Sequence, residues 1–324
     1  MEQHRTFRVG STVILLCLLL RLFASDVPQR FMAILRQKTQ TLSTAIEETG
    51  RNVRFSPSLS GFFPDFVETP APSRPAPTEP PITSLSEQEA AAELFNAAKV
   101  SPDTAALLTQ PLEWNLKAEE PTVLILHTHA TESYTKKTES YKESASWRTL
   151  DESYNMLSIG DLVAAYLTQS GINVIHDRTL HDRPSYDGAY VAARKTIKAR
   201  LEEYPSILLI LDIHRDAAER SYGQLRTNAM VNGQRTAQLM MVVGTNHDGY
   251  EQNLSLALKL HAQLERQAPG ITRPLQLRAA RYNQDLSPGA LIVEVGAAGN
   301  THPEARRAAA QLAQAVVALA QGTD

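Results

Sequence analysis

Ser206-Ile207-Leu208-Leu209-Ile210-Leu211-Asp212-Ile213 is a strongly apolar run that leads directly to His214. Two other segments have the same design. Thr122-Val123-Leu124-Ile125-Leu126 leads into His127-Thr128-His129-Ala130-Thr131-Glu132, and Ala290-Leu291-Ile292-Val293 leads into Glu294-Val295-Gly296. Each run has the length and composition of a short buried strand. Because ligands gather at the carboxyl ends of strands in open α/β sheets, the three runs predict one shared site.

Helix and strand patterns alternate around these runs. Apolar residues at helical spacing predict a helix within 151–169, and Gly171 is a typical C-terminal cap for it. Thr301-His302-Pro303-Glu304 is a capping box that predicts a last helix from 302. The other expected elements are strands at 172–175 and 237–243 and helices at 186–203 and 250–266. The alternation predicts an α/β fold with a mainly parallel sheet and helices on both faces.

The composition is that of an ordinary globular protein. Of 324 residues, 43% are hydrophobic and 21% are charged, and the net charge is −3. This near-neutral balance gives no reason to expect a nucleic-acid partner. The single cysteine, Cys17, lies in the N-terminal apolar stretch, so the rest of the chain has no thiolate ligand or cysteine nucleophile. Any metal site must therefore use histidine and carboxylate.

The N-terminus has the pattern of a membrane segment. His4, Arg5 and Arg8 precede an apolar run at 9–20. A cleaved signal peptide and a retained anchor both fit this pattern, and the lack of a clean cleavage site favours the anchor. We therefore expect a single membrane span within 1–25. The basic residues before it favour a cytoplasmic N-terminus, which puts the bulk of the chain outside the cytoplasm.

A juxtamembrane segment and proline-rich linker are expected at 26–90. Six of the thirteen residues at 69–81 are prolines, which excludes a helix and predicts an extended, semi-rigid spacer. A disordered tail has the same composition and is the alternative. The catalytic domain is then expected at 91–324.

The candidate metal ligands are His127, His129, Glu132 and His214. Alternate residues of an extended chain share a side, so both neighbouring histidines can face one cation, or one can bind while the other supports it. Imidazole and carboxylate suit zinc, which in catalytic sites has three protein ligands and one open position. For any one of the three histidines, the alternative is a structural residue held by hydrogen bonds.

Glu294 is the candidate general base. An acid inside an apolar strand is costly unless it is paired or functional, and burial raises its pKa toward the range that a base needs. A buried glutamate satisfied by backbone or arginine groups is the alternative. Asp212 or Asp216 can hold the second ring nitrogen of His214. Arg215 can bind a substrate carboxylate or form a surface ion pair.

The polar loop at 176–186 is expected at the same sheet edge, where His181 either contacts substrate or orders the loop. No G-x-S-x-G elbow occurs in the chain, which disfavours a serine triad. A hydrolytic zinc enzyme is therefore the leading hypothesis.

These motifs together resemble the stage II sporulation protein P family over about 120–324. The matching stretches are His127-Thr128-His129-Ala130-Thr131-Glu132-Ser133-Tyr134, His176-Asp177, His181-Asp182, Pro184-Ser185-Tyr186, Gly188-Ala189-Tyr190, Asp212-Ile213-His214-Arg215-Asp216, Tyr282-Asn283-Gln284-Asp285-Leu286-Ser287-Pro288-Gly289, Ile292-Val293-Glu294-Val295-Gly296 and Gly299-Asn300-Thr301. The N-terminal anchor and linker also fit this family.

The resemblance implies a zinc-dependent N-acetylmuramoyl-L-alanine amidase with an α/β fold and a His-Glu-His ligand set. It assigns Glu294 to the water and His214 to the second histidine. The first histidine stays open between His127 and His129. Glu132 is the preferred carboxylate ligand because it belongs to the motif, with Glu139 and Glu143 as alternatives.

The same motifs imply that further residues bind substrate or support the site. These are His181, Arg215, Asp216, Asn283 and Gln284.

The resemblance also implies peptidoglycan as substrate, with cleavage between N-acetylmuramic acid and the stem peptide and endopeptidase action on cross-links. It implies septal wall thinning during forespore engulfment, with stage II sporulation proteins D and M as partners. Two other functions remain open: another zinc hydrolase of wall glycan, such as a deacetylase-like enzyme, and an anchored wall-binding scaffold without catalysis.

Overall fold

The computed structural model describes residues 94–112, 114–134, 148–217, 219–220 and 223–321. The expected anchor at 1–25 and linker at 26–90 lie outside them, so those predictions and the domain boundaries stay predictions. In the part of the chain that is described, no helix is long and apolar enough to cross a membrane.

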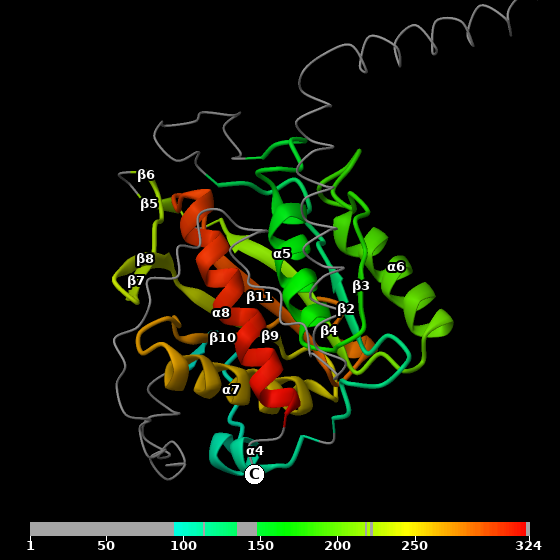
Figure 1. Cartoon of the computed structure of the whole chain (residues 1–324). Coiled ribbons are helices and arrows are strands. Elements are labelled where there is room, and N and C mark those ends of the chain that lie inside the picture. The colour runs from blue at the N-terminus through cyan, green and yellow to red at the C-terminus, as the bar shows by residue number, and fades with distance from the viewer. Residues whose placement is uncertain (1–93, 113, 135–147, 218, 221–222, 322–324) are drawn as a thin grey trace, which may run out of the picture. The chain divides into compact units, whose positions relative to one another are not determined.

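A seven-stranded sheet forms the centre of the fold (Figure 1). In spatial order its strands are β1 (Leu94–Asn96), β10 (Leu275–Arg278), β9 (Leu239–Gly244), β11 (Ala290–Ala297), β4 (Leu209–Asp216), β2 (Val123–Leu126) and β3 (Val174–His176). All neighbours pair in parallel except β11 and β9, which are antiparallel. The prediction of a mainly parallel sheet is confirmed. The expected strand at 237–243 is β9, and it runs against β11.

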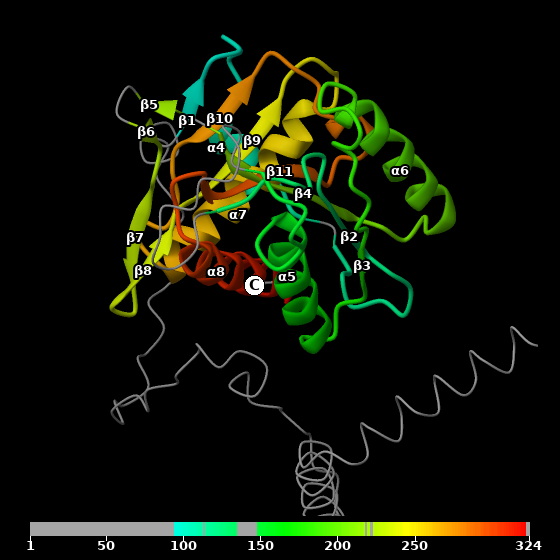
Figure 2. The same ribbon diagram turned by 90° about the horizontal axis from the view of Figure 1, so that it is seen from above.

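Helices cover both faces of the sheet, as predicted. They are α5 (Met156–Gln169), α6 (Ala189–Glu203), α7 (Tyr250–Gln267) and α8 (His302–Ala320), and the short helix α4 (Thr104–Thr109) packs on α7. Figure 2 shows α5 and α8 side by side below the sheet and α6 on the opposite side. Helix α7 packs against α8 and β9. Gly171, with φ +82°, follows α5 as the predicted left-handed cap.

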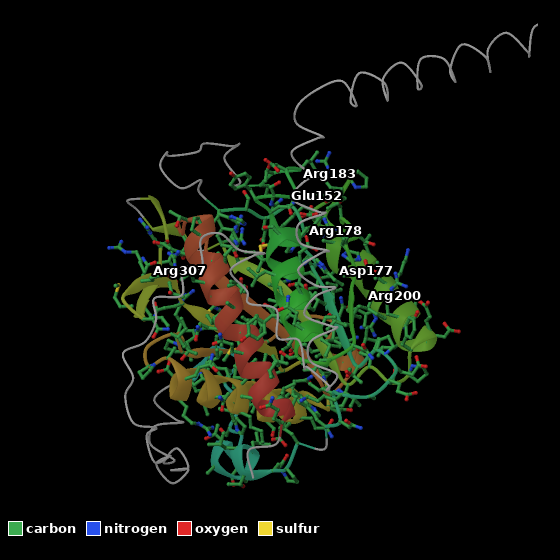
Figure 3. The ribbon with its side chains drawn as sticks, in the orientation of Figure 1. Glu152, Asp177, Arg178, Arg183, Arg200 and Arg307 are labelled. Carbon is green, nitrogen blue, oxygen red and sulfur yellow. The ribbon has the colours of Figure 1, made fainter. Side chains whose placement is uncertain are left out.

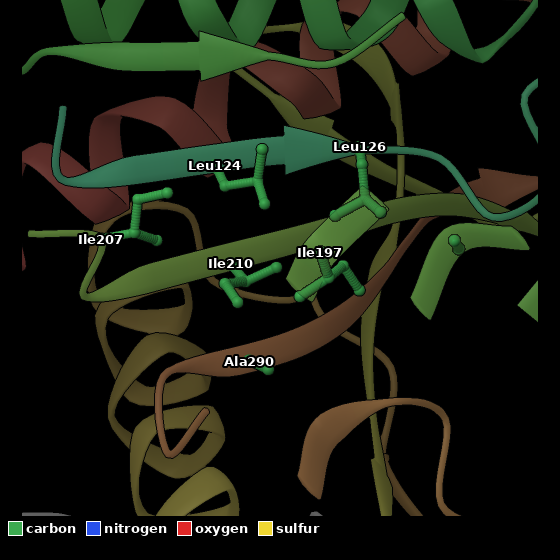
Figure 4. Close-up of a cluster of buried hydrophobic side chains, with 7 residues drawn as sticks. Leu124, Leu126, Ile197, Ile207, Ile210 and Ala290 are labelled. Atoms are coloured by element: carbon green, nitrogen blue, oxygen red, sulfur yellow. The ribbon is translucent and has the colours of Figure 1, made fainter. Parts of the chain in front are cut away.

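The alternation of side chains along β2 and β4 decides which residues face which helices. Leu124 and Leu126 pack with Ile210 of β4 and with Ile197 of α6 (Figure 4). Residues of the same parity on β4, including Asp212 and His214, therefore point to the α6 face. Residues of the other parity point toward α5.

Two short antiparallel pairs lie outside the sheet. They are β5 (Glu219–Arg220) with β6 (Gly223–Gln224), and β7 (Asn228–Val231) with β8 (Gln234–Ala237). Asn232 and Gly233 join β7 to β8 with φ values of 50° and 75°, as a two-residue type I′ turn requires. The Asn-Gly pair is a strong hairpin signal, but this hairpin was not among the predicted elements.

Candidate active site

Strands β4 and β11 bring His214 and Glu294 together. The two residues are direct partners in the parallel register, and Ile292 is the partner of Asp212. Partners in a parallel pair point to the same face, so both side chains lie on the face that α6 covers. His214 is buried, and Glu294 is mostly buried with its Oε2 shielded from solvent. The register of two strands therefore sets the base beside the candidate ligand.

The turn after β2 adds His129 and Glu132 to this pair. Thr128 anchors the turn to β4, because its backbone N donates to Asp212 Oδ1 at 2.7 Å and its hydroxyl donates to Asp212 Oδ2 at 2.6 Å. The rings of His129 and His214 are 5.4 Å apart and nearly perpendicular. Glu132 Oε2 lies 3.7 Å from His214 Nδ1. Two imidazoles and a carboxylate thus meet in one place, next to Glu294.

His127 lies apart from this cluster. Its Nδ1 is 2.9 Å from the Ile213 carbonyl, and its Nε2 is 2.9 Å from His176 Nε2. Gly160 of α5 lies against this pair, since a Cβ there would come within 2.5 Å of His127 Nε2. His127 has the parity of Ile125 and points toward α5, whereas the turn at 128–131 redirects His129 to the other face. The alternation of side chains between the two faces does not continue past the end of β2. Only His129 of the two neighbouring histidines therefore lies beside His214.

The other candidate residues are held by hydrogen bonds to their neighbours. His181 has both ring nitrogens engaged, with Nδ1 2.9 Å from the His127 carbonyl and Nε2 2.9 Å from Thr196 Oγ1. Its position therefore matches the loop-ordering role. Gln284 bonds two backbone groups of β9: its side-chain oxygen accepts from Gly244 N at 2.7 Å, and its side-chain nitrogen donates to the Val242 carbonyl at 2.8 Å.

Arg215, Asp216 and Asn283 are also held by neighbours. Arg215 is buried beside Glu132, with Nη1 3.6 Å from Oε1, and its Nε donates to the Ser133 carbonyl. Asp216 pairs with Arg273 at 2.7 Å. Asn283 Nδ2 donates to the Tyr190 carbonyl at 2.8 Å. Arg215 is thus an internal partner of a candidate ligand and is not a surface ion pair.

Burial and charge set unusual pKa values in the cluster. Burial raises the pKa of Glu294 to about 8, with Glu132 and Asp216 adding to the rise and His214 and Arg215 opposing it. Burial alone would lower the pKa of His214, but the carboxylates of Asp212, Glu132 and Glu294 outweigh burial and raise it to about 10. His214 Nε2 lies 2.9 Å from Asp212 Oδ1, as an ion-pair contact without regular hydrogen-bond geometry.

His129 has the opposite electrostatic character. Burial lowers the pKa of His129 to about 4. The carboxylate of Glu132 opposes this shift, and the nearby His214 adds to it. A neutral imidazole is the form that binds a metal ion, so His129 already has the binding form, whereas His214 would release its proton on binding. Its Nδ1 is buried and has no hydrogen-bond partner among the described residues.

Zinc suits the donor types of this cluster. No group of three or more His, Cys, Asp or Glu side chains within the described ranges is already spaced as a metal site. However, the 3.7 Å between His214 Nδ1 and Glu132 Oε2 is close to the span of about 3.4 Å for two ligands at ~2.1 Å from one tetrahedral zinc. The unpartnered His129 Nδ1 is a further donor. His129, Glu132 and His214 therefore fit zinc in chemistry and approximate spacing.

Two aromatic residues of the site were not identified as site residues from the sequence. Tyr186 stacks on His129 with ring centres 4.1 Å apart, and Tyr190 stacks on His214 at 6.4 Å. They come from the loop before α6 and from its first turn. The signal was present, because both residues belong to the polar loop and the short motifs that follow β3.

A cavity of about 550 Å³ lies elsewhere in the fold. It is lined by residues that follow β9 and precede β11, including His247, Arg281 and Asp285. This is the amino end of β11, whereas Glu294 lies toward the carboxyl end. The cavity and the histidine–carboxylate cluster are thus separate features.

The chain matches a known protein family. Residues 67–317 match the family described as Stage II sporulation protein P. The chain belongs to the stage II sporulation protein P family. The Stage II sporulation protein P of Bacillus subtilis (strain 168) is 28% identical over 262 residues, which cover 78% of this chain. This stage II sporulation protein P family member matches 62% of the length of that relative.

Three solved structures have a limited likeness to the fold of this family member. An N-acetylmuramoyl-L-alanine amidase of Nostoc punctiforme is 16% identical and covers 62% of this chain and 95% of its own, with a TM-score of 0.37. An N-acetylmuramoyl-L-alanine amidase from Clostridium difficile 630 is 16% identical over 63% of this chain and 96% of its own, with a TM-score of 0.36. A product-bound cell shape determinant protein from Helicobacter pylori is 13% identical over 65% of this chain and 53% of its own, with a TM-score of 0.37.

Proposed function

We propose that this chain is a zinc-dependent peptidoglycan amidase that cleaves between N-acetylmuramic acid and the L-alanine of the stem peptide. The observation that carries the proposal is the register pairing of Glu294 with His214, next to His129 and Glu132. This set combines the ligand types of a hydrolytic zinc site with an acid whose pKa is raised to about 8. Membership of the stage II sporulation protein P family supports a wall substrate.

In this proposal His129, Glu132 and His214 hold the metal ion. Zinc, when bound, supplies Lewis-acid polarisation of the scissile carbonyl and activation of water. Asp212 holds the second nitrogen of His214 and so fixes the ring, while Arg215 offsets the charge of Glu132. Glu132 and His214 are therefore each oriented by a second buried residue.

Glu294 moves the proton. Its Oε2 has no hydrogen-bond partner among the described residues, so it is free to accept a proton from the attacking water. The protonated acid then donates to the amide nitrogen as it leaves. Burial raises the pKa of Glu294 to about 8 in the metal-free site, and a cation bound beside it would lower that pKa toward the range in which a carboxyl both accepts and releases a proton.

The cellular setting is part of the proposal. We place the catalytic domain outside the cytoplasm, tethered by an N-terminal anchor within 1–25, and assign it to septal wall thinning during forespore engulfment. Stage II sporulation proteins D and M are the proposed partners. The support is the sequence pattern of the N-terminus and the family of the chain.

Product analysis on purified sporulating cell walls tests the activity. The amidase releases stem peptides with a free N-terminal L-alanine, and cleavage of cross-links converts cross-linked peptide dimers into monomers. Release of acetate alone would assign a deacetylase instead. A scaffold would release nothing and would purify without stoichiometric zinc. The Glu294→Gln variant, assayed at equal zinc content, is the matched control.

A further inference from the structure

Three planar groups form a column at the edge of the candidate site. The Tyr186 ring stacks on the His129 ring at 4.1 Å and 18°, and the Arg148 guanidinium carbon lies 3.5 Å from the centre of the Tyr186 ring. Two groups this close to one ring centre cannot share a face, so Tyr186 is held between the imidazole and the guanidinium. Arg148 is thus one ring removed from a proposed zinc ligand.

The backbone fixes Arg148 in this position. Arg148 and Glu132 form an isolated antiparallel bridge, and Thr149 N donates to the Thr131 carbonyl at 2.8 Å. The turn that carries His129 and Glu132 therefore also carries the segment that presents the guanidinium. Arg148 is therefore fixed beside the turn that carries two proposed zinc ligands, close to where a substrate would bind.

The guanidinium has donors to spare. Stacking uses its face and a side-chain hydrogen bond joins it to Tyr186, which leaves its other N–H groups pointing outward in the plane. The Arg148 Nε is buried and has no hydrogen-bond partner among the described residues. By contrast, the neighbouring Arg215 is engaged by Glu132 and Ser133. The shielded Nε of this partly exposed arginine is thus a donor for a bound anion, and the planar fork suits a carboxylate best.

We propose that Arg148, held against Tyr186, is a subsite for a carboxylate on the peptide side of the scissile amide. The inference rests on the proposed function and extends it to specificity. The glycan next to the cut is uncharged, whereas a stem peptide carries free carboxylates, so a cation here selects the peptide arm. Two stacking distances, 4.1 Å and 3.5 Å, separate the His129 ring from the Arg148 guanidinium. Together they are about the length of two extended residues. The preferred substrate is an acidic peptide with its carboxylate about two residues from the bond.

Equilibrium binding to zinc-loaded Glu294→Gln protein tests this without turnover. The two ligands are N-acetylmuramoyl tetrapeptide with free carboxylates and the same compound with those carboxylates converted to carboxamides. We expect the acidic ligand to bind at least tenfold more tightly to this protein. Adding Arg148→Gln should weaken the acidic ligand roughly 10- to 100-fold, as loss of a charge-assisted hydrogen bond does, and change the amide ligand less than threefold.

Two further variants separate recognition from structure. Arg148→Lys keeps the charge but lacks the planar fork and should bind the acidic ligand with intermediate affinity. Arg183→Gln removes an exposed arginine of the loop that precedes α6 (Figure 3) and should leave both affinities unchanged. Equal affinity of the Glu294→Gln protein for the two ligands, or equal weakening of both by Arg148→Gln, would overturn the subsite. Failure to hydrolyse walls would instead count against the amidase, because binding is measured separately.

Discussion

Glu294 carries the most specific chemical role in the account, and its substitution should affect catalysis alone. Glu294→Gln keeps the volume and removes the acid, so we expect wall hydrolysis to fall roughly 100- to 10,000-fold, as loss of a general base does. Zinc content and the thermal midpoint should stay at the wild-type values or rise, because a buried acid is removed. Turnover measured beside metal analysis checks this, and undiminished hydrolysis would remove Glu294 from the mechanism.

The two neighbouring histidines should behave differently. His129→Ala removes a proposed ligand, so zinc occupancy should fall well below one per chain. His127→Ala breaks the contacts to Ile213 and His176 and should lower the free energy of unfolding by about 1–3 kcal/mol, with zinc retained. Metal analysis and urea denaturation of both variants check this. The opposite pattern, zinc lost only from His127→Ala, would reverse the assignment.

Residue types in the site were predictable, whereas their directions were only partly so. The places of His214, Glu132 and Glu294 at the ends of apolar runs predicted them as site residues. The choice between His127 and His129 stayed open because alternation applies only inside a strand, and β2 ends at Leu126. The position of Arg148 could not be predicted, because it depends on a backbone bridge to Glu132 between segments that a loop separates.

At the scale of elements, the contact of α5 with the sheet depends on a missing side chain. A Cβ at Gly160 would lie 2.4 Å from His176 Nε2 and 2.5 Å from His127 Nε2. Gly160→Ala should therefore cost about 1–3 kcal/mol of stability despite the better helix propensity of alanine. Gly188→Ala is the control, since a Cβ there meets nothing closer than 3.7 Å. Chemical denaturation that ranks the two variants equally would refute this packing.

The start of α8 should make stability depend on pH. Glu304 is buried and accepts from Thr301 N and Asn300 Nδ2, both at 3.0 Å, and it pairs with Arg226. Burial opposes its ionisation, but these partners outweigh burial and lower its pKa below 4.5. The stabilisation is thus present above pH 4.5 and is lost as the pH falls through the lower, folded-state pKa.

Glu304→Gln should accordingly lower the free energy of unfolding at pH 7 by about 1–3 kcal/mol. The difference from the wild type should shrink as the pH falls below 4.5, because the wild-type acid is then protonated as well. Urea denaturation at pH 7 and at pH 4 measures both differences. A gap that widens toward acid pH would contradict the assigned sign.

Elements with strong local signals were predictable. The runs that became β2, β4 and β11, the glycine that follows α5 and the capping box of α8 are each specified within a few residues. The antiparallel direction of β9 was not predictable, because a buried apolar strand looks the same in either direction. Strands β1 and β10 have only three and four residues, which is too short for a clear periodic pattern; β10 pairs with β9, and β1 pairs with β10.

At the scale of the whole molecule, the sheet order concentrates the chemistry on one side. Strands β11, β4 and β2 are adjacent and parallel, so their carboxyl ends lie at one edge. That edge gathers the histidines and acids that are far apart in sequence. The central claim is that these residues bind one zinc ion and set Glu294 beside its water.

A crystal structure of the zinc-loaded full chain, with anomalous data at the zinc edge, tests this claim most directly. We predict a single strong peak about 2.0–2.2 Å from donor atoms of His129, Glu132 and His214, with Glu294 facing the fourth position and not bound. A peak on His127 and His176, or a zinc ion bound by other residues far from Glu294, would contradict the account.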